Sequence, residues 1–153
     1  MQVKYVNPFL NASVRLFRDH LGLRVESGKP FLLQDPQALY EVSGIIGLAG
    51  ETRGAVVLSF GRETAIRIVS RFAGQEFVAL GNEVLDGVGE LINIIAGNAK
   101  QDLLEFRIQI SLPGVITGNS YKIHWPEGVP VVCIPFSCEF GPFSVNVSLK
   151  DIA

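Results

Sequence analysis

The chain has 153 residues, of which 48% are apolar and 18% charged, so it can bury a sizeable core and is too apolar to be disordered. Thirteen Lys and Arg residues against 15 Asp and Glu residues give a formal net charge of −2, which offers no basic surface to nucleic acid or to an anionic membrane. The first residues lack the apolar segment of a signal peptide, and no run approaches the ~20 apolar residues of a membrane span. These features predict one cytoplasmic domain over residues 1–153 that binds neither nucleic acid nor membrane.

A first helix is predicted to begin at Asn7, because Asn is a favourable N-cap and Pro8 suits the first helical position. Apolar residues then recur at helical spacing as far as Leu21. Gly22 follows and is the expected C-cap, since glycine readily adopts the left-handed conformation that ends many helices.

The residues that follow alternate between β-rich stretches and helical patterns. Gly54 stands between two β-rich stretches and predicts a hairpin turn there. A second helix is predicted over residues 62–74, with Gly74 at its end. Strand-like stretches lie at 30–34, 40–50, 54–61, 106–118, 129–140 and 143–152.

This order of elements contains a weak repeat, because a helix followed by strands occurs twice. Asn11 precedes Pro30 by 19 positions, and Asn93 precedes Pro113 by 20. An internal duplication explains this, although many α/β chains could be aligned with themselves in the same way. Since strands mostly follow one another through hairpins, we expect an α+β fold with two related halves, a largely antiparallel sheet, and the two long helices packed on one face.

The two cysteines, Cys133 and Cys138, fall in one predicted strand at an odd separation, which would place them on opposite faces of a sheet. Free, buried thiols are therefore expected. A local disulfide stays open as an alternative, because Pro135 lies between them and could interrupt the strand.

The longest predicted helix covers residues 80–104 and has two unlike faces. Asp86, Glu90, Asn93 and Gly97 lie within about 60° of one another around the helix axis, on its polar face. The opposite face would anchor the helix on a sheet, which would hold the polar groups rigidly. That apolar face consists of Val84, Leu85, Val88, Leu91, Ile92, Ile95, Ala96, Ala99 and Leu103.

A solvated helix face is the simplest interpretation of this polar stripe. Such a face usually mixes Lys and Arg with its acids at i+4, whereas no basic residue occurs here between Glu83 and Lys100. The helix also contains Gly87, Gly89 and Gly97, each of which costs ~1 kcal/mol relative to Ala. Either a partner or another element of the same chain is therefore expected to approach the backbone closely.

The stretch "DGVGELINIIAGNAK" is similar to the signature helix of the CheC/CheX/FliY family of chemotaxis phosphatases. In that signature an Asp or Ser, a Glu and an Asn follow at i, i+4 and i+7, and a Pro comes roughly twenty residues later. Asp86, Glu90, Asn93 and Pro113 match these positions. The stretches "NPFLNASVRLF" and "GLAGETRGAVVLSF" also resemble the CheX branch, so the resemblance spans most of the chain.

Family members with two sites carry a second copy of this signature in their first helix. Here Asn11 stands at the Asn position, but Pro8 and Lys4 occupy the two acidic positions. The resemblance therefore implies a single active helix, as in CheX.

The resemblance implies hydrolysis of the phospho-aspartate of a phosphorylated CheY-type response regulator. Asn93 would position the attacking water through its amide, as the water-positioning Gln does in GTPases. Glu90 would pair with a lysine of the regulator, while Asp86 and Gly97 would contact the partner. No cofactor is expected on this chain, because the divalent metal, Mg²⁺, would be supplied by the regulator's site. The resemblance also implies a homodimer.

The alternative function is a non-catalytic adaptor that binds a response regulator or a flagellar switch component through the same helix. The amide of Asn93 beside Glu90 favours catalysis. Other enzyme motifs, such as a P-loop or a nucleophile elbow, are absent from the sequence, and its two His and two Cys lack zinc-site spacing. For the dimer, the apolar late stretches at 129–136 and 143–149 are expected to need cover from a second copy, since unprotected strand edges invite pairing.

Overall fold

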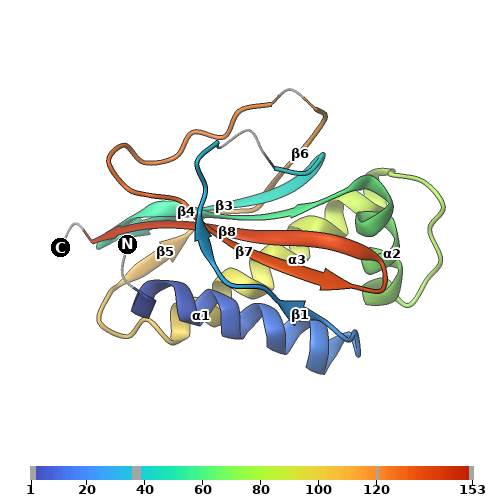
Figure 1. Cartoon of the computed structure of the whole chain (residues 1–153), viewed down its shortest axis with the longest axis horizontal. Coiled ribbons are helices and arrows are strands. Elements are labelled where there is room, and N and C mark those ends of the chain that lie inside the picture. The colour runs from blue at the N-terminus through green and yellow to red at the C-terminus, as the bar shows by residue number, and fades with distance from the viewer. Residues whose placement is uncertain (1–2, 36–38, 120, 152–153) are drawn as a thin grey trace.

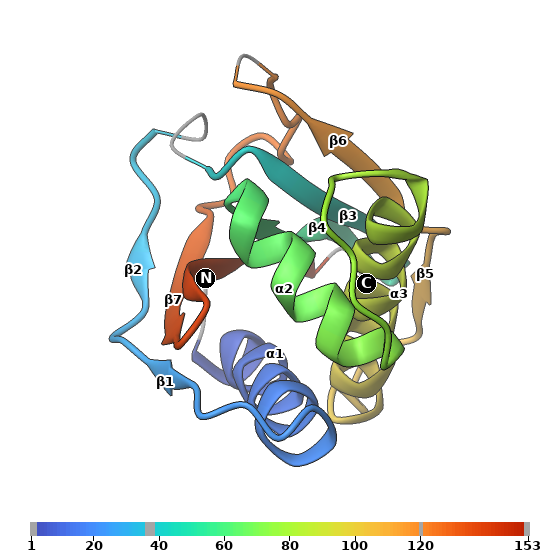
Figure 2. The same cartoon turned by 90° about the vertical axis from the view of Figure 1, so that its right-hand side faces the viewer.

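A computed structural model describes residues 3–35, 39–119 and 121–151. In these residues three α-helices lie against one face of a curled antiparallel sheet: α1 (Val3–Val14), α2 (Arg62–Ala73) and α3 (Asn82–Gln101) (Figures 1 and 2). A π-helical segment, η1 (Arg15–His20), continues α1. The strands are β1 (Glu26–Ser27), β2 (Phe31–Leu32), β3 (Val42–Gly50), β4 (Thr52–Phe60), β5 (Ile108–Ile110), β6 (Gly114–Thr117), β7 (Val132–Cys138) and β8 (Gly141–Asp151).

The sheet has the strand order β1-β7-β8-β4-β3-β5, with β2 also pairing with β7 and β6 with β3. Each half of the chain consists of a helix, two short strands and a long hairpin: α1, β1, β2 and β3–β4 in the first, and α3, β5, β6 and β7–β8 in the second. The short strands of each half pair with the hairpin of the other half, and β4 and β8 meet at the centre, where Val56 is opposite Val147. The predicted α+β fold, with its antiparallel sheet and its helices on one face, is confirmed.

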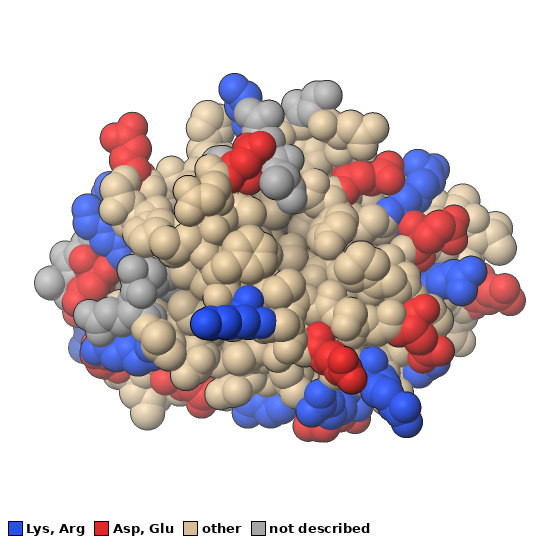
Figure 3. Space-filling view, in the orientation of Figure 1, with Lys and Arg blue, Asp and Glu red and all other residues tan. Residues whose placement is uncertain are grey.

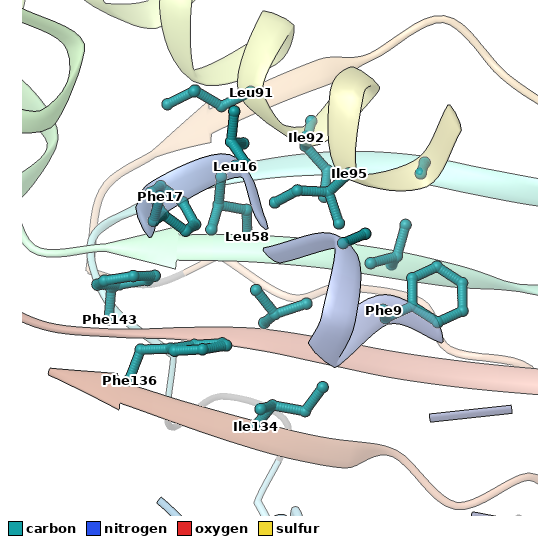
Figure 4. Packing of buried hydrophobic residues seen from close by; sticks show 14 of the residues in the cluster. Phe9, Leu16, Phe17, Leu58, Leu91, Ile92, Ile95, Ile134, Phe136 and Phe143 are labelled. Carbon is teal, nitrogen blue, oxygen red and sulfur yellow. The ribbon is translucent and has the colours of Figure 1, made fainter. Parts of the chain in front are cut away.

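The core fills the space between the helices and the central strands (Figure 4). Successive side chains of a strand point to opposite faces, so alternate residues of β4 and β8 face the helices. Aromatic rings meet at one end of this layer, where Phe143 lies 4.8 Å from Phe17 and 5.3 Å from Phe60 between ring centroids. From α3, Leu91, Ile92 and Ile95 are fully buried, at a gain of ~0.8 kcal/mol per buried methylene. The predicted apolar face of this helix is therefore the face that packs.

Residues 121–131 pass over the opposite face of the sheet (Figure 1). There the Ser43 hydroxyl lies within hydrogen-bond distance of the Ser59 hydroxyl (2.9 Å) and of the Tyr121 hydroxyl (2.6 Å). Cys133 is buried on this face of the sheet, whereas Cys138 packs against the core on the helix side. The two cysteines therefore lie on opposite faces, as their odd separation in β7 predicted. Both cysteines are free, and burial raises the pKa of each thiol.

The predicted start of the first helix at Asn7 was wrong. The helix already includes Val3, and Pro8 lies inside it. Tyr5 and Val6 are buried in the core, so packing of this first turn extends the helix beyond the proline, whose missing N–H would otherwise favour a helix start at this point.

The predicted hairpin turn at Gly54 was also wrong. Gly54 lies within β4, opposite Leu48 of β3, and the connection is made instead at Gly50, with a φ of +85°, and Glu51. A Cβ at Gly54 would lie 2.0 Å from the carbonyl oxygen of Ser148 in β8. This glycine is therefore needed for the close approach of two central strands and not for a turn.

The late strands do not form an open edge of the sheet. β8 lies between β7 and β4, and the free side of β7 is paired with β1 and β2. The cover that the sequence analysis expected from a second copy is therefore supplied by the first half of the same chain.

Candidate functional site

The predicted polar stripe lies on the outer face of α3. Asp86, Glu90 and Asn93 are exposed, while the residues of the opposite face are buried, apart from the half-buried Leu85. With a rise of 1.5 Å per residue, Glu90 follows Asp86 by about 6 Å along the helix axis and precedes Asn93 by about 4.5 Å. Three polar side chains are thus presented in a row by a helix that the core holds in place.

The acids of this stripe form no ion pair within the described part of the chain. Its ion pairs are formed by other carboxylates, those of Glu41, Glu63, Asp102, Glu105 and Glu139. Glu83, Asp86 and Glu90 contribute to none of them, and neither does Asn93 contribute to a side-chain hydrogen bond there. These groups are free to interact with another molecule.

The three glycines of α3 have different surroundings. A Cβ at Gly87 would lie 2.4 Å from Cγ1 of Val69, so α2 packs directly on the backbone there. A Cβ at Gly89 would contact Val115 and Pro113 at 3.5 and 3.6 Å. Gly97 faces open space. Close packing of other elements of the same chain therefore explains Gly87 and Gly89, which was one of the two predicted alternatives. It does not explain Gly97.

Pro113 lies in the connection between β5 and β6 and reaches α3 next to the stripe. Its side chain is 3.6 Å from the Cβ position of Gly89, the residue that precedes Glu90. The following strand, β6, pairs with β3 and so fixes this connection. Leu112, just before the proline, is 90% exposed. Leu112 was not predicted as a surface residue of this site, although an apolar residue beside a proline in a loop was the available signal.

The first helix presents a different surface. Pro8 is buried and Asn11 exposed. Lys4 Nζ lies 3.3 Å from Glu105 Oε2, and Arg15 Nη2 lies 3.2 Å from Asp102 Oδ2. The hydrogen bond to Glu105 raises the pKa of the Lys4 ammonium. The acidic positions of the signature are thus occupied in α1 by a core residue and by a cation with a partner in the same chain.

A hollow that the sequence did not predict adjoins the stripe. It has a volume of about 350 Å³ and lies between the end of α2, the connecting residues 75–77 and the first turns of α3. Glu83, Asp86 and Glu90 line it from α3, and Phe72 and Phe77 line it from the opposite side. The carboxylates of the stripe therefore border a depression with two aromatic rings on its far side, and not only open solvent.

Within the described ranges no group of three or more His, Cys, Asp and Glu side chains is arranged to hold a metal ion. None of the helices described there combines the length and apolar composition that crossing a membrane requires.

Comparison with known proteins places this fold among the CheC-like structures. Residues 42–137 match the family model described as "Chemotaxis phosphatase CheX". The CheY-P phosphatase CheX of Thermotoga maritima is 31% identical over 126 residues, which cover 80% of this chain and 81% of that protein. The crystal structure of the chemotaxis protein CheX from Vibrio vulnificus is similar with a TM-score of 0.87 and 30% identity, covering 97% of this chain and 100% of that one.

A third structure is a complex. The CheX of the CheX–CheY–BeF₃–Mg²⁺ complex from Borrelia burgdorferi has a TM-score of 0.82 and 31% identity, covering 97% of this chain and 99% of that one. Fold and comparisons thus define a helix-on-sheet protein of the CheC-like class. Within that class, the chain belongs to the CheX family of chemotaxis phosphatases.

Proposed function

We propose that this chain hydrolyses the phospho-aspartate of a phosphorylated CheY-type response regulator, and that the whole chain acts as one CheX-like phosphatase domain. The observation that carries the proposal is the exposed row of Asp86, Glu90 and Asn93, without partners in the described chain, on a helix whose other face is buried. The relative in Thermotoga maritima is named a CheY-P phosphatase, and that of Borrelia burgdorferi forms a complex with CheY.

The chemistry that such a row must perform is small. A phospho-aspartate is an acyl phosphate, so its carboxylate is a good leaving group, and hydrolysis requires mainly a water in line with the bond that breaks. The Asn93 amide offers one donor and one acceptor group, which can orient a water without titrating. Positioning of this kind lowers the activation barrier because the water loses its orientational entropy before the reaction step and not during it. It needs no general base on this chain.

The remaining residues have docking roles in this proposal. Glu90 pairs with a lysine of the regulator and so fixes Asn93 relative to the phosphoryl group. Asp86 adds negative charge beside this pair. Gly97 leaves open space one turn beyond Asn93, so the regulator can approach the helix backbone there. The divalent metal, with Mg²⁺ as the expected ion, belongs to the regulator's site, and the Borrelia burgdorferi complex contains Mg²⁺ together with CheY.

The test is the rate of phosphate release from a phosphorylated CheY-type regulator with Mg²⁺, measured with and without this chain. We expect the rate of phosphate release to rise in proportion to the concentration of this chain, even when the chain is far less abundant than the regulator. Binding to the phosphorylated regulator without acceleration would contradict the proposal and would favour the adaptor function instead.

A homodimer in the cytoplasm stays a prediction. Among the described strands, β2 carries two exposed large apolar side chains, Phe31 (50% exposed) and Leu32 (54%), and a second copy would cover this surface. Light scattering at micromolar concentration is expected to give a dimer mass, and a monomer mass would count against it.

A further inference from the structure

The hollow between α2 and α3 is built before any partner arrives. Its α2 side is fixed because a backbone bend at Gly74, with a φ of +65°, ends the helix and turns the chain back along it. The N–H of Phe77 donates to the Ser70 hydroxyl (3.0 Å), which in turn donates to the Ile66 carbonyl (2.7 Å). Its α3 side is fixed because Val69 packs on the bare backbone of Gly87. The hollow therefore has a definite shape.

Among the described residues, only acidic groups carry charge on the wall of this hollow. Glu83, Asp86 and Glu90 line it, and no Lys or Arg does. The arginines on the outer face of α2 are engaged elsewhere, since Arg67 pairs with Glu63 at 3.9 Å and Arg71 with Glu139 at 3.9 Å. The hollow thus concentrates negative charge that the described part of the chain does not compensate.

The opposite wall contains two aromatic rings, and Gln75 is its polar residue. Phe72 and Phe77 are half-buried and pack on the core with one side, which leaves the other side to the hollow. A site with an aromatic wall and a carboxylate rim suits a long cationic side chain, because Lys and Arg place their aliphatic stems on apolar surface and their charged heads at a polar edge. The rings add a cation–π attraction when the head lies over a ring face.

We propose that this hollow receives a second cationic side chain, a Lys or Arg, of the same response regulator. This inference rests on the proposed function, since Glu90 belongs both to the hollow and to the docking row. The hollow therefore extends the docking surface from α3 onto α2, away from the reacting phosphoryl group. Of the residues that line the hollow, Glu83 and Phe77 lie outside the docking row, so in this proposal they affect which regulator binds and have no part in hydrolysis.

The experiment measures phosphate release against the concentration of phosphorylated regulator, with the full chain and the variants Glu83→Gln, Glu83→Lys and Phe77→Leu. We expect Glu83→Gln to raise the half-saturating regulator concentration about two- to fivefold without changing turnover at saturation. Charge reversal in Glu83→Lys should raise it about tenfold or more. An exposed Lys or Arg of the regulator changed to Glu should restore binding to the Glu83→Lys variant.

The matched controls are Asp19→Asn, an exposed acid far from the hollow in sequence and without a described ion pair, and Leu104→Ala, an 88% exposed apolar residue. Both should behave as the unmodified chain. Circular dichroism of Phe77→Leu separates a folding defect from a docking defect. If the unmodified chain accelerates release and Glu83→Lys does so with the same half-saturation, the hollow is not a docking site. If the unmodified chain does not accelerate release at all, the proposed function itself fails.

Discussion

Helices α1 and α3 occupy corresponding places in the two halves and lie side by side under the sheet, yet they offer opposite chemistry (Figure 2). The cations of α1 and η1 are used within the chain: Lys4 and Arg15 bind the acids that follow α3, and Arg18 donates to the Val25 carbonyl at 2.6 Å. The acids of α3 form no ion pair with any residue that the structure describes. The charged groups of α1 and η1 are thus paired within the chain, whereas those of α3 can bind another molecule. The two halves differ less in fold than in which charged groups are available to a partner.

The space-filling view supports this contrast in part. Acidic and basic groups alternate along the lower rim of the molecule in the orientation of Figure 1, where α1 lies, and the surface there is mixed in sign (Figure 3). A mixed surface of paired charges has a weak field, whereas an uncompensated acidic row attracts a cationic partner over about one Debye length.

The largest effect is expected from removing the acid that would anchor the partner. Glu90→Ala should weaken binding of the phosphorylated regulator by about 2–5 kcal/mol, because loss of one member of a desolvated ion pair leaves the other charge buried. A loss of only ~0.2–1 kcal/mol would mean that the pair stays hydrated. Isothermal titration calorimetry gives the affinity. Glu105→Ala, which removes an acid that serves α1, is the matched control and should leave it unchanged.

The next effect concerns the two corresponding amides. Asn93→Ala should preserve folding and regulator binding, since the side chain is exposed, but lower turnover by about 10²-fold because the attacking water loses its position. Asn11→Ala removes the same amide from α1 and should leave turnover unchanged. Single-turnover phosphate release at saturating chain concentration separates chemistry from affinity. Wild-type turnover in the Asn93 variant would refute the water-positioning role.

Sequence alone predicted most of the fold and the row on α3. Periodicity located the buried face of α3, and Gly74 marked the end of α2 because its left-handed conformation is local information. The start of α1 and the role of Gly54 depend on packing of distant residues: Tyr5 and Val6 on the core, and β8 on β4. No local pattern encodes such contacts, so local rules assigned both positions incorrectly.

For the site, too, the features set by local sequence were predictable and those set by contacts between distant residues were not. The row on α3 was predictable, because three residues on one helix face have a fixed relation to one another. The hollow was not, since it requires that the end of α2 lie against Gly87 and that Phe77 return along α2. Likewise the sequence could not tell which glycines of α3 pack within the chain. Only the three-dimensional arrangement separates Gly87 and Gly89 from Gly97.

That separation of the glycines can be tested by changing each to alanine. Gly87→Ala should lower the free energy of unfolding by about 1–3 kcal/mol, because the new methyl group overlaps Val69 and forces α2 away from α3. Gly97→Ala should raise it by up to ~1 kcal/mol, since the helix gains propensity and the position is open. Denaturant unfolding measures both. Weaker regulator binding by the more stable Gly97→Ala variant would show that a partner approaches the bare backbone there, and unchanged binding would contradict that role.

The smallest effect is expected for the ion pair between Arg15 and Asp102. The side chains of Arg15 and Asp102 are 51% and 50% exposed, so solvent screens their attraction. A double-mutant cycle with Arg15→Ala and Asp102→Ala should give a coupling energy of about 0.2–1 kcal/mol in the free energy of unfolding, falling as salt is added. Neither variant should alter phosphate release, because the pair joins η1 to Asp102 at the end of α3 and includes no residue of the docking row. If breaking this pair allowed a second molecule of the phosphorylated regulator to bind measurably at α1, the ion pair alone would be what prevents the first half of the chain from binding it. We expect no such event, because Pro8 is buried and α1 carries no acid in place of Glu90.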